Sequence, residues 1–292
     1  MWLWIVFIFI VAIIAYIIWQ KKELKKFTVS VFEIPVDCDD NCGNSDMISK
    51  FVVISDLHNQ VYGKNNRLLL NKIDEIQPEF IVIAGDMMIA KPGYSLDVAL
   101  EFIKAIAEKY KVYYGIGNHE YRLKIYPERY PGMYEQFINE IKKSNVVLLE
   151  NKSVVFEKND VKINITGLEI ERQYYKRIKN IKMPEGYIES LIGEKTNIYT
   201  ILVAHNPEYF DDYAEWGANL VLSGHIHGGM VRLPYLGGVI SPKVRLFPEY
   251  DAGLFEKNGS YMILSRGLGM HTIPVRINNR AELVEVHLKR KG

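Results

Sequence analysis

The feature that most restricts how this chain can fold is an uninterrupted apolar run at its N-terminus. Residues 2–19 read WLWIVFIFIVAIIAYIIW and contain no charged side chain. As an α-helix this run would extend about 27 Å at roughly 1.5 Å per residue, close to the thickness of a bilayer's hydrocarbon core. A helix that is apolar on every side has to be enclosed by protein or by lipid. The run therefore predicts a transmembrane helix over residues 1–20, with a buried core helix as the less favoured alternative.

A cleaved signal peptide is the other alternative for this segment. Such a peptide has a basic stretch before the apolar run and a small-residue cleavage site after it, and the sequence shows neither. Basic residues follow the run instead, at Lys21, Lys22, Lys25 and Lys26. Because positively charged flanks of membrane helices stay in the cytoplasm, this pattern predicts a single-pass membrane protein whose remaining chain faces the cytoplasm.

The rest of the composition permits one large domain and does not favour a nucleic-acid partner. The chain has 292 residues, 48% of them hydrophobic, and a formal net charge of +1. That content is sufficient for a sizeable core, and a charge near zero exerts no general attraction on nucleic acid. The cysteines Cys38 and Cys42 match no zinc or thioredoxin spacing. They are expected to be free thiols, or a small local disulfide if the segment lies outside the cell.

From residue 50 onward, short apolar runs alternate with segments of helical spacing. The runs span residues 51–54, 80–84 and 112–116, and the helical segments span 66–76 and 96–110. The second half contains more strand-like runs than one open sheet holds comfortably, which favours two stacked sheets flanked by helices. Residues 21–49 lack clear periodicity and are predicted to be a linker to a domain over residues 50–292.

Five polar clusters follow strand-like runs, and they contain most of the residues capable of metal chemistry. In chain order they are Ser55-Asp56-Leu57-His58, Gly85-Asp86, Gly117-Asn118-His119-Glu120, His205-Asn206-Pro207 and Gly224-His225-Ile226-His227-Gly228-Gly229. Sites in open α/β sheets form at the carboxyl ends of the strands, so we expect the clusters to converge if their strands are parallel. Two-residue spacing in extended backbone also places both side chains on one face, as for Asp56 with His58.

Each cluster alone has an ordinary structural interpretation. Asp-x-His and Gly-Asp sequences are common in turns, and a single histidine such as His205 is more often a buried structural residue. The Gly-His-x-His-Gly-Gly cluster is more specific, because two imidazoles on one side repel when protonated and make sense as neutral metal ligands. The occurrence of all five clusters, each after a strand, favours a metal site.

Through these clusters the sequence resembles the calcineurin-like metallophosphoesterases, whose pattern runs D-x-H, G-D, G-N-H-D/E, H and G-H-x-H. The resemblance extends from about residue 50 to the C-terminus. It is closest to small membrane-anchored or exported bacterial members, through GHIHGGMVRLP, SRGLG and PVRINNRAELVEVHL. It implies an α/β fold with four layers, an α/β/β/α sandwich of two mixed β-sheets flanked by helices. Met230 and the pair Met87-Met88 depart from that subgroup, at positions that concern substrate fit rather than metal binding.

The same resemblance implies a role for each polar residue. One metal ion would be bound by Asp56, His58 and His227, a second by Asn118, His205 and His225, and Asp86 would bridge the two ions. His119 would stay off the metals and face the substrate, and an imidazole can donate a proton to a leaving alkoxide near neutral pH. Glu120 is expected either to orient that imidazole or to be solvated. Oxygen and imidazole ligands without thiolates suit two Mn, Fe or Zn ions.

The expected activity is hydrolysis of a phosphomonoester, phosphodiester or pyrophosphate by a metal-activated water. Further candidates for binding the substrate are Arg232, Arg266 and His271, against ordinary structural roles for all three. The apolar segment 230–240 is broken by Pro234, Gly237 and Gly238, as expected for a lip beside the site. A lip near a membrane suggests a lipid-linked substrate. The resemblance implies a UDP-acylated sugar as one such candidate, because some members of the family cleave the pyrophosphate of nucleotide-activated acylated sugars.

Several alternatives to this prediction stay open. The lip segment could instead be ordinary core, and the substrate a soluble phosphodiester. A non-catalytic metal-dependent binding module and a membrane scaffold with a vestigial hydrolase domain are further alternatives. An amide hydrolase is disfavoured, because the chain lacks an HExxH helix or another peptidase signature. Exported relatives make an extracytoplasmic domain the alternative to the cytoplasmic one.

Overall fold

Two six-stranded sheets form the centre of the molecule. The computed structural model describes residues 2–37, 46–158, 161–176, 181–233, 235–239, 246–270 and 275–291. The first sheet has the order β1 (Phe27–Val36), β14 (Ala281–Arg290), β2 (Met47–Ile54), β3 (Phe80–Ala84), β4 (Lys111–Gly115) and β5 (Val146–Leu149). The second has the order β12 (Gly253–Lys257), β13 (Ser260–Leu264), β9 (Leu220–Ser223), β8 (Tyr199–Ala204), β7 (Val161–Leu168) and β6 (Lys152–Lys158). The sequence-based prediction of two mixed sheets is confirmed.

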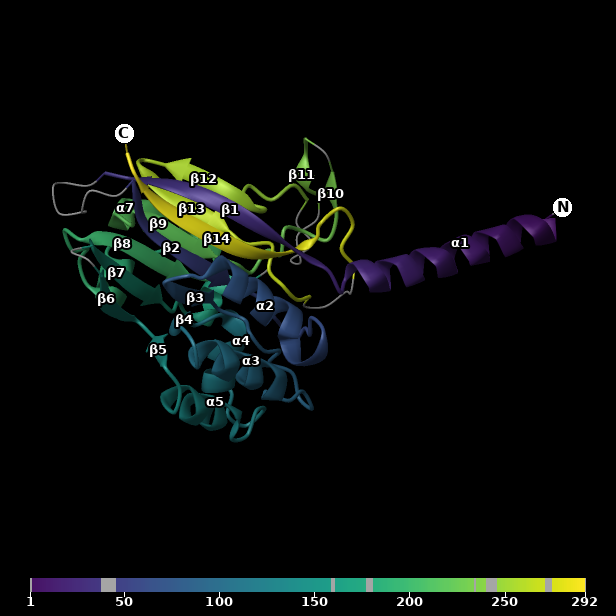
Figure 1. Cartoon of the computed structure of the whole chain (residues 1–292), viewed down its shortest axis with the longest axis horizontal. Coiled ribbons are helices and arrows are strands. Elements are labelled where there is room, and N and C mark those ends of the chain that lie inside the picture. The colour runs from purple at the N-terminus through teal and green to yellow at the C-terminus, as the bar shows by residue number, and fades with distance from the viewer. Residues whose placement is uncertain are drawn as a thin grey trace.

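Helices cover the outer face of each sheet, which gives the four layers (Figure 1). The first sheet is covered by α2 (Arg67–Ile76), α3 (Asp97–Ala107), α4 (Asn118–Ile125) and α5 (Met133–Lys142). The second sheet is covered by α6 (Tyr187–Ile192) and α7 (Phe210–Trp216). Short 3-10 helices at Lys64–Asn66, Arg172–Tyr175 and Pro207–Tyr209 complete the connections. A small hairpin of β10 (Arg232–Leu233) and β11 (Gly237–Gly238) stands apart from both sheets.

The alternation of side chains along β2 shows how the layers are held together. Phe51 and Val53 pack between the sheets, whereas Val52 and Ile54 pack under the helices of the first layer. Successive residues of a strand point to opposite faces, so a strand buried on both faces is apolar throughout. Full burial of one such side chain stabilises the fold by about 1.5–3 kcal/mol. The core therefore consists of three apolar layers, one between the sheets and one under each set of helices.

Parallel pairing within the sheets determines where the site can form. Strands β2, β3, β4 and β5 pair in parallel in the first sheet, and β7, β8, β9 and β13 pair in parallel in the second. Antiparallel pairs occur where β14 meets β2, β12 meets β13 and β6 meets β7. The carboxyl ends of the parallel strands in each sheet therefore lie at a common edge.

The structure differs from the sequence-based linker over residues 21–49. Residues 27–36 form β1, which pairs with all ten residues of β14 at the other end of the chain. Its apolar pattern is weak because only Ile34 and Val36 are buried, while the other positions are half-buried or exposed. A pairing partner more than 200 residues away leaves no local signal. The domain boundaries themselves stay a prediction, and Cys38 and Cys42 lie outside the described residues.

Helix α1 (Trp2–Glu23) projects from the sandwich (Figure 1). Its residues 4–23 are long and apolar enough to cross a membrane, and only 6% of its most apolar window is buried against the rest of the chain. Three residues, Leu24 to Lys26, separate its end from β1. The apolar helix is therefore attached to the first sheet with almost no intervening chain.

Candidate metal centre

The five polar clusters meet where the carboxyl ends of β2, β3, β4, β8 and β9 come together. Three overlapping groups of side chains each have their potential ligand atoms within 4.8 Å of one another. The groups are Asp56 with His58 and His227, His58 with Asp86 and His119, and Asp86 with His205 and His225. Because the strands come from both sheets, the site forms at the junction of the two halves of the sandwich.

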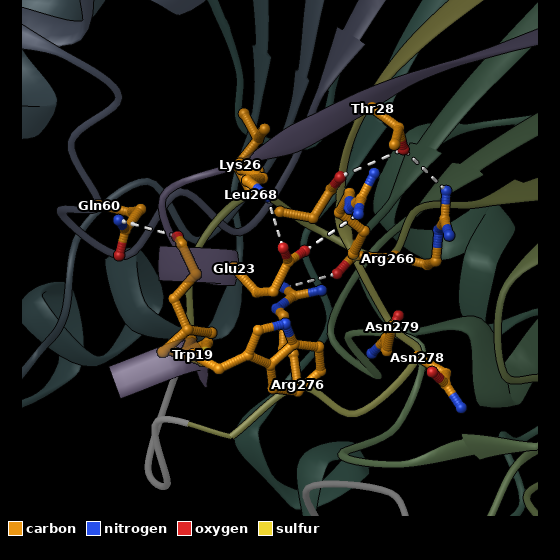
Figure 2. A pocket seen from close by; sticks show the side chains of 14 residues that line it. Trp19, Glu23, Lys26, Thr28, Gln60, Arg266, Leu268, Arg276, Asn278 and Asn279 are labelled. Carbon is orange, nitrogen blue, oxygen red and sulfur yellow. Dashed lines mark hydrogen bonds and ion pairs between the residues drawn. The ribbon is translucent and has the colours of Figure 1, made fainter. Parts of the chain in front are cut away.

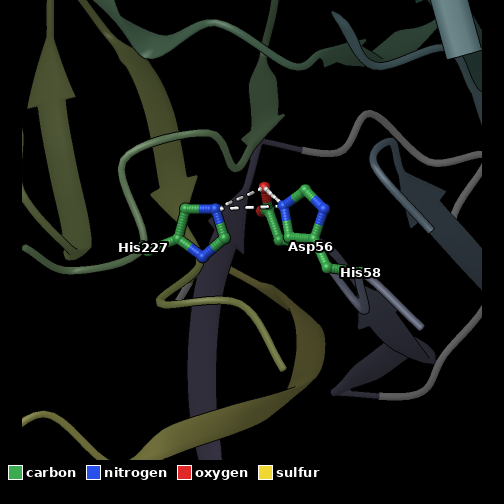
Figure 3. A group of neighbouring side chains, drawn as sticks. All are labelled: Asp56, His58 and His227. Carbon is green, nitrogen blue, oxygen red and sulfur yellow. Dashed lines mark hydrogen bonds and ion pairs between the residues drawn. The ribbon is translucent and has the colours of Figure 1, made fainter. Parts of the chain in front are cut away.

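The first group combines the loop after β2 with the loop after β9. Figure 3 shows the side chains of Asp56, His58 and His227 pointing toward one another. The Nε2 atom of His227 lies 3.3 Å from Asp56 Oδ1 and 3.2 Å from His58 Nε2. The other ring nitrogen of His227, Nδ1, lies 3.3 Å from the carbonyl oxygen of Gly269. The contact at Nδ1 turns Nε2 toward Asp56 and His58, and this orientation is usual for metal-binding histidines.

The third group, of Asp86, His205 and His225, joins the loop after β3 to the loops after β8 and β9. His205 Nδ1 lies 2.6 Å from the carbonyl oxygen of Ala84, and its Nε2 lies 3.1 Å from Asp86 Oδ2. The carbonyl fixes the Nδ1–H tautomer and turns Nε2 toward the carboxylate. Asp86 Oδ2 is also 3.9 Å from His58 Nε2, which belongs to the first group. The carboxylate of Asp86 thus lies between the first group and the third.

Asn118 supplies an amide at the start of α4, directly after β4. Its side chain is buried, and its Oδ1 atom has no hydrogen-bond partner among the residues that the structure describes. A buried polar atom without a partner costs about 1–3 kcal/mol of stability. An amide oxygen of this kind is satisfied by a cation. Together with the converging carboxylates and imidazoles, it makes a donor set that fits Mn, Fe or Zn.

Most of these residues are held in an unusual backbone conformation. Five of the seven expected ligands have a positive φ, namely Asp56 at 51°, His58 at 47°, Asp86 at 56°, His225 at 72° and His227 at 55°. The left-handed region costs a non-glycine residue of the order of 1–3 kcal/mol, and such residues concentrate at functional sites. Backbone bonds from Asp56 N to Gly85 O at 3.0 Å and from His58 N to Asp86 O at 3.2 Å hold the turn.

Close packing around Asp56 leaves no room for a side chain at positions 224 and 267, which are both glycine. A Cβ atom added to Gly224 would lie 2.2 Å from Asp56 Oδ2 and 2.0 Å from Ser55 Oγ. Gly267 has a φ of +67° and would place a Cβ 2.7 Å from that of Asp56. Ser55 Oγ donates to Asp56 Oδ2 at 2.5 Å, and His225 N donates to both carboxylate oxygens. The carboxylate is therefore fixed by its neighbours before any ion binds.

The buried charges in the site balance one another. Burial by itself raises the pKa of Asp56, but the imidazoles of His227 and His205 lower that pKa well below its usual range. The pKa of Asp86 is lowered in the same way, by His205 and His119 against the effect of burial. Burial lowers the pKa of His205, but Asp86 and Asp56 raise it to about 10. Two carboxylates without solvent thus require positive charge beside them.

Glu120 braces the loops of the site rather than orienting an imidazole. Its carboxylate accepts hydrogen bonds from the backbone N–H groups of Asp86 at 3.0 Å, Met87 at 2.8 Å and Gly117 at 3.1 Å. It also accepts one from the hydroxyl of Tyr114 at 2.7 Å. Burial raises the pKa of Glu120 to about 6. The residue connects the turn that carries Asp86 to the turn that carries Asn118.

His119 is buried beside the carboxylate of Asp86. The N–H group of Ala90 donates to His119 Nδ1 at 2.7 Å, and His119 Nε2 lies 4.0 Å from Asp86 Oδ2. A donor at Nδ1 places the proton of the neutral ring on Nε2. The ring therefore presents an N–H group toward the ligand cluster.

Two of the candidate substrate-binding residues, Arg232 and Arg266, have partners outside this cluster. Arg232 pairs with Asp251 at 2.9 Å and donates to the carbonyl of Gly228, and Arg266 pairs with Glu282 at 2.6 Å. His271 lies outside the described residues. Tyr175, whose ring stacks edge-on at 5.2 Å from His225, is a neighbour of the site that no motif in the sequence indicates. The SRGLG segment contributes the glycines that pack on Asp56 and its loop.

Comparisons with known proteins agree with this geometry. The model of the calcineurin-like phosphoesterases matches residues 49–229. The chain is 29% identical to YpbG of Bacillus subtilis over 78% of this chain and 76% of that protein. It is 24% identical to a bovine transmembrane protein with a metallophosphoesterase domain, over 89% of this chain and 57% of that protein. It is 21% identical to the phosphodiesterase YaeI of Escherichia coli, over 73% and 72% of the two chains. The chain belongs to the calcineurin-like phosphoesterase family, and it is a metal-dependent phosphoester hydrolase.

Proposed function

We propose that this hydrolase works with two metal ions, one on each side of the carboxylate of Asp86. The supporting observation is the position of Asp86 Oδ2, which lies 3.1 Å from His205 on one side and 3.9 Å from His58 on the other. Asp56, His58 and His227 would hold one ion, and Asn118, His205 and His225 the other. Such a pair would supply positive charge to neutralise the phosphate and to activate a water as the nucleophile.

The chain's own residues contribute position and a hydrogen bond. Glu120 holds the turns of Asp86 and Asn118 at a fixed distance through its backbone bonds. Asp56 is enclosed by Ser55, Gly224 and Gly267, so its carboxylate does not have to reorganise during turnover. Fixed groups that need no reorganisation are the main source of electrostatic catalysis.

His119 is the group we assign to the substrate's oxygen atoms. The Ala90 N–H occupies Nδ1, which leaves Nε2–H as the donor beside the shared carboxylate. In this tautomer the ring donates a hydrogen bond to a phosphoryl or leaving oxygen. Full proton donation, which the sequence predicts, needs a second proton at Nδ1 and therefore loss of the Ala90 bond. The two roles are distinguishable with leaving groups of different basicity.

The test of the metal centre is metal content combined with turnover. Purified full-length protein should contain two equivalents of Mn, Fe or Zn and hydrolyse p-nitrophenyl phosphate or its bis ester. A single equivalent that supports full turnover would overturn the binuclear arrangement. Metal without any turnover on a broad panel of esters would instead favour the non-catalytic binding module.

We further propose that α1 anchors the hydrolase in a membrane with the catalytic domain in the cytoplasm. The apolar window of the helix and the lysines that follow it support this orientation. Protease added to intact cells should then spare the domain, whereas protease added after lysis should degrade it. Degradation in intact cells would place the domain on the extracytoplasmic side.

We also propose that the substrate is amphiphilic, with a phosphate or pyrophosphate group attached to a lipid or to an acylated sugar. The supporting observation is the hairpin of β10 and β11, which follows directly from the histidines of the site. Tyr235 is fully exposed and Leu236 is 62% exposed, so this part of the segment is not core. In Figure 1 the hairpin lies at the end of the sandwich from which α1 projects. A soluble phosphodiester is the alternative substrate.

A further inference from the structure

A second pocket lies where helix α1 meets the sandwich, apart from the metal cluster. Its volume is about 470 Å³. The side chains that line it include Trp19, Glu23, Lys26, Arg266, Arg276 and Arg280. Figure 2 shows the first five of these gathered around the pocket, from the end of α1 and from the segments before β14. The pocket is thus built from both ends of the chain.

Most of the charge that lines this pocket is positive. Glu23 is the one carboxylate in the described lining, and it pairs with Lys26 at 2.6 Å and with Arg280 at 3.0 Å. Arg266 is neutralised from behind the pocket by the buried carboxylate of Glu282. Arg276 has no carboxylate partner within the described ranges. The pocket therefore carries a net positive charge that its own residues do not balance.

Arg276 is the residue that most requires a ligand. It is only 7% exposed, and its Nη2 atom donates to the carbonyl oxygens of Arg266, Gly267 and Gly269 at 2.9, 3.1 and 2.6 Å. Its Nη1 atom is buried and has no hydrogen-bond partner in the part of the chain that the structure describes. Burial lowers the pKa of Arg276 to about 10, so the guanidinium stays charged at neutral pH. A buried cation with an unused donor is costly unless an anion lies beside it.

Asn279 adds an unused acceptor to the same pocket. Its Nδ2 atom donates to the carbonyl oxygens of His227 and Gly229, which fixes the orientation of the amide. Its Oδ1 atom is buried, and no donor among the described residues reaches it. The pocket therefore offers a cationic donor and a neutral acceptor. A matching ligand carries an anionic oxygen together with a hydroxyl or another donor.

The pocket lies at the level of lipid headgroups if α1 spans a membrane. Trp19 ends the apolar run, and an indole at that position is typical of the membrane–water interface. Only Leu24 to Lys26 separate α1 from β1, and the ion pair of Glu23 with Arg280 connects the helix end to the segment before β14. The pocket is therefore held close to the bilayer surface.

We propose that this pocket binds the headgroup of an anionic phospholipid that also carries a hydroxyl, as in a glycerol headgroup. The lipid phosphate would accept from Arg276 Nη1, and the headgroup hydroxyl would donate to Asn279 Oδ1. The lipid is a bound ligand and not a substrate, because the described lining contains no histidine and only one carboxylate. This inference rests on the proposed membrane position of α1 and is independent of the proposed binuclear chemistry.

Native mass spectrometry of the full-length, metal-loaded protein in detergent tests this proposal. Phosphatidylglycerol and phosphatidylcholine are titrated separately, and the retained lipid is counted. We expect one phosphatidylglycerol to be retained at least about tenfold more tightly than phosphatidylcholine, as one charged hydrogen bond implies. Arg276→Lys should remove this preference, because the single ammonium group of Lys cannot donate hydrogen bonds to the three carbonyl oxygens and to the lipid phosphate together. Equal retention of the two lipids by the wild-type protein would overturn the proposal.

A second variant tests the pocket at a half-exposed residue, where the substitution should not unfold the protein. Arg280→Gln changes a half-exposed side chain whose partner is Glu23, and it leaves that carboxylate facing the pocket with less compensation. We expect it to weaken phosphatidylglycerol retention several-fold with unchanged thermal unfolding. Arg129→Gln, an exposed cation between α4 and α5, is the matched control and should change nothing. The same loss in the Arg129 variant would show a nonspecific charge effect and contradict a specific site.

Two further arms separate a bound lipid from a bound soluble phosphate and from an effect of the metal centre. Inorganic phosphate and glycerol 3-phosphate should displace phosphatidylglycerol only at concentrations far above that of the lipid. Displacement at equal concentration would mean that the pocket takes a soluble phosphate, and the lipid proposal would fail. Asp86→Asn should retain the lipid while it loses turnover, so failure of the metal mechanism does not affect this test. Recovery of the full-length chain in the soluble fraction would refute the membrane position and the lipid site together.

Discussion

The metal cluster and the pocket beside α1 meet at Gly269, and their charges are complementary to different ligands. The carbonyl oxygen of Gly269 lies 3.3 Å from His227 Nδ1 of the cluster and 2.6 Å from Arg276 Nη2 of the pocket. The cluster has carboxylates and imidazoles and needs cations. The pocket has a guanidinium and needs an anion. A phosphate group therefore binds directly in the pocket, whereas in the cluster it needs metal ions between itself and the protein.

The two regions differ in whether they can activate a nucleophile for hydrolysis. In the cluster, Asp56 and Asp86 are fully buried, so bound cations concentrate positive charge at one point and can activate a water. In the pocket, a phosphodiester meets hydrogen-bond donors alone, which stabilise its ground state without supplying a nucleophile. We therefore expect a phosphate ester to be cleaved in the cluster and held intact in the pocket.

The largest effect that separates the two regions should come from Asp86→Asn. Loss of the shared carboxylate weakens both metal positions, and bound metal supplies several kcal/mol of transition-state stabilisation. We expect kcat/KM for p-nitrophenyl esters to fall by about 10³-fold or more, since each 1.4 kcal/mol is about tenfold. Metal content should fall with it. Asp74→Asn, an exposed carboxylate paired with Lys109, is the control and should retain both. If the Asp86→Asn enzyme keeps more than about a tenth of the wild-type turnover, Asp86 is not a ligand shared by the two metal ions.

The next effect concerns His119 and the N–H group that it presents at Nε2. His119→Ala should lower kcat by about 10²–10³-fold, the loss typical of one donor to a developing oxyanion, while both metals stay bound. His119→Gln retains an N–H donor on a side chain of similar reach, so it should recover part of that loss. If His119 instead transfers a proton, Gln should be no better than Ala, and the loss should shrink for p-nitrophenolate compared with alkoxide leaving groups.

The layered fold and the members of the metal cluster are predictable from the sequence because both have local signals. Buried strands such as β3, FIVIA, are continuous apolar runs, and each cluster directly follows such a run. Parallel pairing then brings the strand ends together without any further information. The structure brings Asp56, Asp86 and the histidines of the expected ligand set within reach of one another, although their roles as ligands stay a prediction.

Features that depend on distant pairing are absent from the sequence-based prediction. The sequence assigns β1 to the linker, because its partner β14 lies at the other end of the chain. The two-residue spacing of Asp56 with His58 predicts extended backbone, whereas the structure has left-handed turns there, and His225 shares that conformation. The role of Arg276 is equally nonlocal, because its partners are carbonyl oxygens rather than a recognisable motif.

Metal binding in the cluster should depend on pH, whereas lipid retention in the pocket should not. Burial lowers the pKa of His205, but Asp86 and Asp56 raise it to about 10. The imidazole of the metal-free protein is therefore protonated on both nitrogens, and positively charged, at pH 7. A ligating imidazole must be neutral, so metal binding releases one of these protons. Affinity should therefore rise with pH up to about 10 and fall by about tenfold for each unit below it.

Calorimetry in buffers of different ionisation enthalpy measures the protons released on metal binding. His287→Gln, which changes a histidine paired with Glu285 on β14, is the control and should leave proton release unchanged. Proton release of zero between pH 6 and 8 would show that the cluster is already deprotonated without metal. Lipid retention in the neighbouring pocket should be constant over the same range, because Arg276 stays charged throughout.

The smallest effect should come from the hairpin, where only the apolar part of a substrate is in question. Tyr235→Ser and Leu236→Ser together remove two exposed apolar side chains from the β10–β11 turn. Fully burying one such side chain is worth about 1.5–3 kcal/mol, and partial contact with an acyl chain a fraction of that. We expect kcat/KM to fall several-fold for a long-chain phosphoester and to stay unchanged for its short-chain analogue. Val155→Ser, a half-exposed position on β6, should affect neither substrate. If the wild-type enzyme gains nothing from acyl chains, the hairpin does not contact the substrate and a soluble phosphodiester is the better assignment.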